Sequence, residues 1–192
     1  MKKAFLLVSI LFVSVVSTAC INNFAVQELN NKAKSYLEQG DFENAISRLK
    51  SSIDLDSTIF ETHYNLGIAY TQAEKFPEAV ETFKNAIKLR PNFADAYYSL
   101  AVAQENFAKG IIDGSLVMNE EKNEIQRTDK DLDAIAEEDR KLTEKEKEQI
   151  KYLFEQAMES YNLYLKKGKT INDKEEVEDK VIYLQNQLLK YS

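Results

Sequence analysis

The chain has 192 residues, of which 44% are hydrophobic and 30% charged, enough for one domain with an apolar core but not for a second large one. Its formal net charge of −7 repels phosphate backbones, which argues against nucleic acid as a partner. One Cys and one His allow neither an internal disulfide nor a Cys/His metal site, and the scarcity of Gly and Pro favours an all-α protein.

The N-terminal segment is typical of a signal peptide. Two lysines at 2–3 precede an apolar run over 4–16, and small residues follow up to the only Cys, Cys20. The uncharged stretch 4–19 has 16 residues, fewer than the ~20 that a helix needs to span a bilayer. We therefore predict a signal peptide over 1–19, and a permanent transmembrane anchor is the weaker interpretation.

The sequence Ser-Thr-Ala-Cys that ends in Cys20 resembles a bacterial lipobox, with Ser17 at a position where Leu is usual. The resemblance implies cleavage between Ala19 and Cys20 and attachment of lipid, with palmitate among its acyl chains, to the Cys20 thiol. Residues 20–25 would then tether the protein to a membrane of the cell envelope. In lipoproteins of bacteria with two membranes, an Asp directly after the Cys is the usual signal for retention in the inner membrane, and this chain has Ile21 there. The resemblance therefore favours the outer membrane, facing the periplasm, in an organism with two membranes. An ordinary cleaved leader and an uncleaved anchor stay open as alternatives.

A 34-residue period runs through the first half of the chain. Shifting the sequence by 34 positions aligns similar residues: Ala33 with Gly67, Tyr36 with Tyr70, Phe42 with Phe76, Ala45 with Ala79, Ile46 with Val80, Leu49 with Phe83, Ile53 with Ile87 and Leu55 with Leu89. The stretch 60–93 resembles a tetratricopeptide repeat (TPR), a helix-turn-helix unit that must stack on neighbours. It carries the signature residues Leu66, Gly67, Tyr70, Ala79, Phe83, Ala86 and Pro91. The copy over 26–59 matches more loosely, as is expected at the end of a solenoid.

A third copy starts at Ala94 and stays in register to about Ala108. Its second helix resumes only near Ala157, so extra residues have been inserted within the repeat. We therefore predict a third TPR over 94–167, interrupted by a charged helical insertion at about 109–142.

The insertion has two parts of different composition. The first, 109–117, contains Gly110 and Gly114 and is predicted to be a loop whose apolar residues fold back on the stack. The second, 119–149, is dense in acidic and basic residues. We interpret it as a solvated helix or a partly disordered arm, with a partner-docking arm as the alternative.

A long helix is predicted after the insertion. Thr143 and Glu146 fit a capping box, so this helix should begin there. It should run to about Lys167 and stop at Gly168.

The last segment, 173–191, has its apolar residues on one helical face, and Asp173 with Glu176 forms a second box-like start. We expect a capping helix that covers the open end of the solenoid. The predicted fold is thus an all-α TPR solenoid of about three repeats, a charged helical insertion in the third, and this C-terminal cap.

No motif for catalysis is found in the sequence. Phosphate-binding Gly-rich loops, Ser/His/Asp arrangements, HExxH and CxxC motifs are all missing. The one His, His63, stands where Trp is commonest in the repeat and is interpreted as a packing residue. We predict a protein that is not an enzyme and that needs neither cofactor nor metal.

The resemblance implies a concave groove lined by the first helix of each repeat. The positions that face this groove in the family are here Gln27, Asn30, Asn31, Lys34, Leu37, Glu38, Glu61, Tyr64, Asn65, Ile68, Thr71, Gln72, Asp95, Tyr98, Ser99, Val102, Glu105 and Asn106. The residues that we select as a partner groove are Asn30, Asn31, Lys34, Tyr64, Asn65, Ile68, Gln72, Tyr98, Val102 and Asn106. Amides can donate to and accept from an extended backbone, and tyrosines offer flat contact area. The alternative is that these are ordinary exposed positions of polar helix faces.

One mode of recognition is disfavoured. TPR domains that grip a chaperone's C-terminal carboxylate use basic residues in the third repeat, where this chain has Asp95 and Ser99. Lys34 and Asn65 alone would not form that clamp. The leading hypothesis is a membrane-anchored lipoprotein that acts as an interaction scaffold or assembly factor in the bacterial cell envelope. The alternative is an accessory subunit that presents a small ligand to a transporter.

Overall fold

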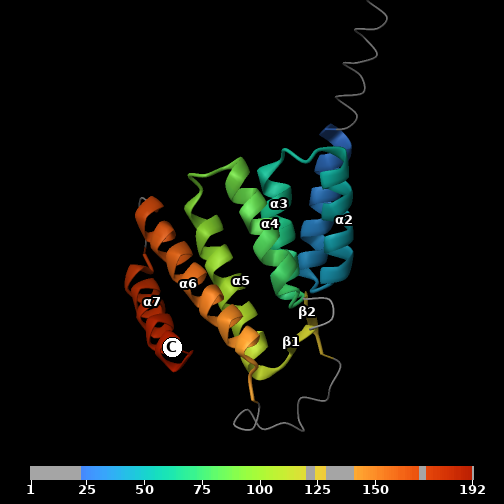
Figure 1. Ribbon diagram of the computed structural model, residues 1–192. Coiled ribbons are helices and arrows are strands. Elements are labelled where there is room, and N and C mark those ends of the chain that lie inside the picture. Colours follow the sequence, from blue (N-terminus) through green and yellow to red (C-terminus); the bar gives the residue numbers. More distant parts are fainter. Residues whose placement is uncertain (1–22, 120–123, 129–140, 169–171, 192) are drawn as a thin grey trace, which may run out of the picture.

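The computed structural model describes residues 23–119, 124–128, 141–168 and 172–191. The predicted signal peptide and Cys20 lie outside these ranges. The described part is a stack of antiparallel helix pairs (Figure 1), so the predicted all-α TPR solenoid is confirmed. Among the described residues, no helix combines the length and the apolarity that crossing a membrane requires.

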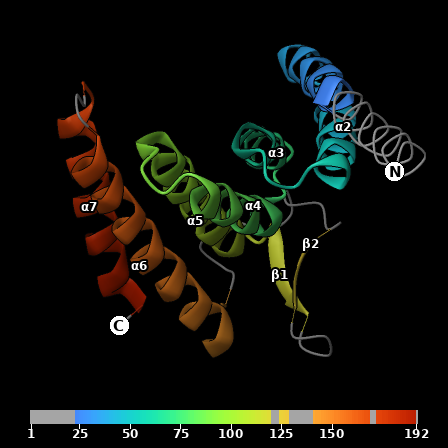
Figure 2. The same cartoon turned by 90° about the horizontal axis from the view of Figure 1, so that it is seen from above.

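Three helix pairs build the stack. The first joins a helix over 23–38 to α2 (Phe42–Leu55), and the second joins α3 (Phe60–Gln72) to α4 (Phe76–Leu89). The third joins α5 (Ala94–Asp113) to α6 (Glu144–Lys167) across the insertion. In Figure 2 the pairs follow one another from the first repeat at one edge to α7 (Lys174–Leu188) at the other.

Short polar turns and caps set the start of each second helix. Gly40, with φ +75°, makes the turn before α2, and the Asp41 carboxylate then accepts a hydrogen bond from the Asn44 backbone N–H at 3.2 Å. In the second repeat Glu74 takes the left-handed conformation, with φ 56°, and a proline in the first turn helps α4 to begin.

Small residues let the paired helices approach closely. Gly67 of α3 lies against the ring of Phe83 from α4, and a Cβ built at this glycine would fall 2.6 Å from the ring. Ala45, Ala69 and Ala79, which are also small, are fully buried. This is the pairing of small and large side chains that the repeat signature predicts.

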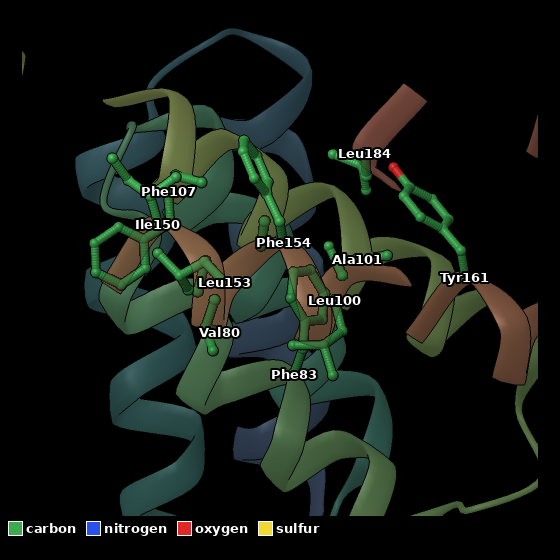
Figure 3. Packing of buried hydrophobic residues seen from close by; sticks show 14 of the residues in the cluster. Val80, Phe83, Leu100, Ala101, Phe107, Ile150, Leu153, Phe154, Tyr161 and Leu184 are labelled. Carbon is green, nitrogen blue, oxygen red and sulfur yellow. The ribbon is translucent and has the colours of Figure 1, made fainter. Parts of the chain in front are cut away.

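The largest core cluster joins the second repeat to α5, α6 and α7. Figure 3 shows large side chains from these helices meeting, and Phe83, Phe154, Tyr161 and Leu184 among them are at most 2% exposed. The apolar face predicted for 173–191 is confirmed, because Val177 and Leu184 are fully buried. The cap is therefore part of the core rather than an appendage.

The prediction of a loop over 109–117 was wrong. Helix α5 continues to Asp113 and ends at Gly114, which has φ 86°. The added turn buries Ile111 completely and sets Gly110 directly against Leu116, so tertiary contacts outweigh the weak helix propensity of glycine. As predicted, Ile111 and Leu116 do fold onto the stack.

The insertion also contains a β-hairpin that the sequence did not suggest. Strands β1 (Leu116–Asn119) and β2 (Glu124–Arg127) pair antiparallel, with Leu116 opposite Arg127. Arg127 forms an ion pair with Glu74 at 2.6 Å, which links the hairpin to the α3–α4 turn. The expectation of a helical insertion is thus wrong for 116–119 and 124–127, and its remaining charged part at 129–140 lies outside the described residues.

Of the two helix starts predicted near the C-terminus, one is confirmed and one is wrong. The capping box of α6 is confirmed: the Glu146 N–H donates to the Thr143 hydroxyl at 3.2 Å, and the Thr143 N–H donates to the Glu146 carboxylate at 3.0 Å. At α7 no side-chain cap forms, so the box-like start was wrong. The Asp173 carboxylate instead accepts a hydrogen bond from the Tyr164 hydroxyl at 2.9 Å, which ties α7 to α6.

Candidate binding groove

A hollow opens between the first helices of the second and third repeats. It has a volume of about 150 Å³ and is lined by Ile68, Thr71, Gln72, Phe83, Tyr98, Ser99 and Val102. We call it the apolar pocket, because Ile68, Phe83, Tyr98 and Val102 supply its hydrophobic surface and none of its described lining residues is charged. Its side walls come from α3 and α5, while Phe83 of α4 reaches it past Gly67, where a Cβ would collide with the ring.

Four of the selected groove residues meet in this pocket. Ile68 and Gln72 are one turn apart on α3, and Tyr98 and Val102 are one turn apart on α5. Ile68, Tyr98 and Val102 are half-buried, whereas the Gln72 amide is exposed at the rim. The pocket can therefore take an apolar side chain and offers an amide beside it.

Tyr64, which was predicted to face a partner, also makes several contacts within the protein. Its ring stacks on Phe60 with centroids 5.6 Å apart and meets the Phe93 ring edge-on at 5.5 Å. Its hydroxyl lies 3.2 Å from the Ser99 hydroxyl, a hydrogen bond that connects α3 to α5. Tyr64 thus fixes the spacing of the two helices that form the pocket walls, next to the half-buried Asn65.

Asn30 was predicted to face a partner, but its amide is used within the protein. The amide nitrogen donates to the Ser52 hydroxyl at 2.8 Å and to the Thr62 hydroxyl at 3.0 Å, while its oxygen accepts from Thr62 at 3.1 Å. Ser52 and Thr62 are fully buried. Asn30 therefore joins the first helix to α2 and α3, and we withdraw it as a free contact for a partner.

The remaining selected residues lie outside the apolar pocket. Asn31 borders a second hollow near the start of the first helix, and Lys34 is exposed on the same helix. Asn106 borders a third hollow beside the hairpin, together with Lys109 and Arg127. Of the selected set, only Ile68, Gln72, Tyr98 and Val102 therefore converge on one pocket.

The electrostatic surroundings of Tyr98 are acidic. Its ring lies 5.7 Å from Tyr161 and 5.2 Å from Tyr164, centroid to centroid. Burial raises the pKa of Tyr98, and the carboxylates of Glu176, Asp173 and Glu105 raise it further. Burial also raises the pKa of Tyr164, to about 12, with the hydrogen bond to Asp173 as the next cause.

Glu105, one of the positions expected to face the groove, is a buried carboxylate with two partners. It accepts a hydrogen bond from the Tyr161 hydroxyl at 2.9 Å, and its other oxygen pairs with the Lys109 ammonium at 2.6 Å. Its charge is thus compensated inside the protein. Burial, followed by the Glu105 charge and hydrogen bond, raises the pKa of Tyr161 well above its usual range.

Sequence reasoning missed two contributors to this site. Phe83 was recognised only as a signature residue of the repeat, although the small Gly67 was a signal that the Phe83 ring lies close to the groove. Asp173 and Glu176 approach Tyr98 only because α7 docks beside α6, and no local pattern carries that information.

The described residues place no metal-binding cluster beside the pocket. His63 is 9% exposed and its Nε2 lies 2.9 Å from the Ser57 carbonyl oxygen, which fits the predicted packing role. Within the described ranges, His, Cys, Asp and Glu side chains do not gather in groups of three or more that could hold a metal ion.

Comparisons with known proteins agree with the geometry. A family model described as TPR repeat matches residues 33–73 and 69–106. Among solved structures, the first TPR of Spaghetti (RPAP3) bound to the HSP90 peptide SRMEEVD aligns with a TM-score of 0.57 at 16% identity, covering 85% of this chain and 93% of that one. The TPR2B domain of yeast Sti1 in its pHsp70 complex aligns with a TM-score of 0.57 at 17% identity, covering 85% of this chain and 98% of that one.

The Arabidopsis OM64 TPR domain aligns with a TM-score of 0.55 at 11% identity, covering 89% of this chain and 99% of that one. At such identities these likenesses establish the fold alone. No curated protein sequence matches the chain. The repeat match, the signature residues and the stacked helix pairs together show that residues 33–106 consist of TPR repeats, which are protein–protein interaction modules, and that the described part of the chain has a TPR fold.

Proposed function

We propose that this protein binds an extended segment of a partner protein on its concave side and holds that partner at a bacterial envelope membrane. The observation that carries the proposal is the apolar pocket between α3 and α5. Ile68, Tyr98 and Val102 are only half-buried there, so their apolar surface is available to a ligand. Burying one aliphatic side chain in such a place contributes about 1.5–3 kcal/mol.

Polar groups around the pocket can hydrogen-bond with the extended backbone of a peptide ligand. Gln72 at the rim and Asn65 one turn before Ile68 carry amides, which can donate to a backbone carbonyl and accept from a backbone N–H. Tyr64 and the helix pairs keep the pocket walls in place, so a ligand need not order them first. The solved complex of the Spaghetti TPR with a peptide supports peptide binding as a use of this fold.

The ligand chemistry of that complex does not transfer to this chain. The peptide SRMEEVD carries three acidic side chains and a C-terminal carboxylate. Here Asp95 stands one turn before Tyr98 and Ser99 on α5, and carboxylates from α7 approach Tyr98. An acidic peptide would be repelled at this position.

The small-ligand alternative takes second place. Pockets that bury a small molecule are usually about 300–1,000 Å³ in volume. At about 150 Å³, the apolar pocket suits one side chain of a longer ligand better than a whole small molecule.

We further propose that Cys20 carries the lipid anchor, at the outer membrane facing the periplasm where the organism has two membranes. The described residues begin at 23, three positions after Cys20. Three residues reach at most about 10 Å, so the start of the first repeat would lie close to the bilayer. Metabolic labelling with a palmitate analogue tests the anchor: Cys20→Ser should remove the label, and a variant that still labels would refute it.

Photo-crosslinking in living cells tests the groove. A benzoylphenylalanine at Gln72 reports on the pocket rim, and the same residue at Asn85, exposed on α4, serves as the control. We expect a discrete protein adduct from the Gln72 site that disappears in a Val102→Asp background and is missing from the Asn85 site. Equal adducts at both sites, or adducts indifferent to Val102→Asp, would sink the proposal.

A further inference from the structure

The apolar pocket is uncharged, but one side of its rim is acidic. Asp95 lies one helical turn before Tyr98 on α5, and it also raises the pKa of Tyr164 beside Tyr98. Asp173, at the start of α7, accepts a hydrogen bond at 2.9 Å from Tyr164, whose ring centroid lies 5.2 Å from that of Tyr98, and Glu176 follows Asp173 one turn later on α7. Three carboxylates from two helices thus surround one aromatic wall of the pocket.

Two other acids of the groove are compensated by basic partners. Glu61 is paired with Arg90 at 2.6 Å, and Glu105 with Lys109 at 2.6 Å. Within the described part of the chain, no Lys or Arg forms an ion pair with Asp95, Asp173 or Glu176. Asp95 and Glu176 are exposed, so a ligand that lies on Tyr98 can reach their carboxylates from solvent.

The aromatic wall adds a second feature that favours a cation. Tyr98 forms a cluster with Tyr161 and Tyr164, and its ring borders the pocket. The face of a tyrosine ring attracts an ammonium or guanidinium group within about 6 Å. The same kind of contact already occurs in this fold, where the Arg90 guanidinium carbon lies 4.2 Å from the Phe60 ring centroid.

We propose that the pocket recognises a basic segment of the partner: an aliphatic side chain enters between Ile68 and Val102, and an adjacent Lys or Arg lies on Tyr98 between Asp95 and the α7 carboxylates. This specificity rests on the function proposed above and narrows its partner class. Charge complementarity selects the occupant, because an acidic or neutral segment would leave the three carboxylates uncompensated.

Selection from a random peptide library displayed on phage tests this specificity. The bait is the full chain purified in detergent, and bound clones are recovered from the wild type and from Val102→Asp. We expect peptides with Lys or Arg beside Leu, Ile or Val to be enriched on the wild type and lost on Val102→Asp.

Neutralising the rim then tests the carboxylates. The double variant Asp95→Asn/Glu176→Gln removes two exposed charges that make no hydrogen bond or ion pair within the described residues. The control, Glu155→Gln/Asp179→Asn, removes two exposed charges away from Tyr98. We expect the first variant to bind a selected peptide roughly tenfold more weakly at low salt, and the second to bind like the wild type. Circular dichroism confirms that both variants keep their helices.

The possible outcomes separate the two proposals. Peptides that require Val102 but show no cationic enrichment, or an unchanged affinity of Asp95→Asn/Glu176→Gln, overturn the basic specificity and leave the groove function intact. Recovery of no peptide that depends on Val102 overturns the proposed function and, with it, this inference.

Discussion

At the scale of single residues, Asn30 and Asn31 show how adjacent amides can have opposite roles. Asn30 connects the buried hydroxyls of Ser52 and Thr62, whereas Asn31 is exposed. Asn30→Ala should lower the free energy of unfolding by about 1–3 kcal/mol, because it removes the amide that bonds two buried hydroxyls and leaves them only their 3.4 Å contact with each other. Asn31→Ala should change it by less than about 0.5 kcal/mol. Urea denaturation measures both, and equal effects would show that the buried network contributes nothing.

Gly67 is predicted to be intolerant of even one methyl group. Alanine is the better helix former by about 1 kcal/mol, but its Cβ would lie 2.6 Å from the Phe83 ring. Gly67→Ala should therefore destabilise the protein by about 1–3 kcal/mol through overpacking. Thermal and urea denaturation give this value. In a Phe83→Leu background the penalty should shrink or change sign, and a penalty equal in both backgrounds would contradict the packing argument.

At the scale of elements, α7 is predicted to be a structural part of the core. Leu184 is fully buried against the cluster of α5 and α6, whereas its neighbour Tyr183 is 48% exposed. Leu184→Ala should cost about 2–5 kcal/mol of unfolding free energy, and Tyr183→Ser less than about 0.5 kcal/mol. Urea denaturation measures both variants. If both unfold at the same urea concentration, α7 does not cap the solenoid in solution.

Local signals account for the elements that the sequence predicted correctly. The capping box of Thr143 and Glu146 is complete within four residues, so the start of α6 is visible in the sequence. The 34-residue period likewise reflects contacts within one repeat. The C-terminal end of α5 was mispredicted because Gly110 and Gly114 suggest a loop, while the burial of Ile111 depends on residues distant in the sequence.

The candidate site likewise contains residues that the sequence predicts and contacts that it does not. Ile68, Gln72, Tyr98 and Val102 could be selected from repeat positions alone, because the family geometry places those positions on one side. The internal role of Asn30 depends on a hydroxyl 32 positions away, and the acidic rim depends on the docking of α7. Such contacts between elements leave no local pattern in a single sequence.

For the whole molecule, the buried tyrosines predict a loss of stability at alkaline pH. Burial raises the pKa of Tyr161 in the folded protein, whereas in the unfolded chain it titrates near its ordinary value of 10.0. Above that pH the unfolded state binds fewer protons than the native state, so the free energy of unfolding falls as pH rises. Below it this tyrosine contributes no pH dependence.

The Tyr161 contribution has a definite slope. It amounts to about 1.4 kcal/mol per pH unit above about pH 10, as long as the native tyrosine stays protonated. Tyr161→Phe should be less stable near neutral pH but should lose stability less steeply between about pH 10 and 11.5. Urea denaturation across this range measures the slopes, and parallel curves for wild type and variant would contradict the assignment.

The central claim is that the concave side of the repeat stack, at the apolar pocket, holds a peptide segment. Methyl NMR of the full chain tests it most directly, with a library-selected basic peptide as ligand. We expect the methyl signals of Ile68 and Val102 to shift on titration, while Ile182, which is 55% exposed on α7, stays unchanged. Shifts at Ile182 with Ile68 and Val102 unmoved would place the ligand elsewhere and contradict the account.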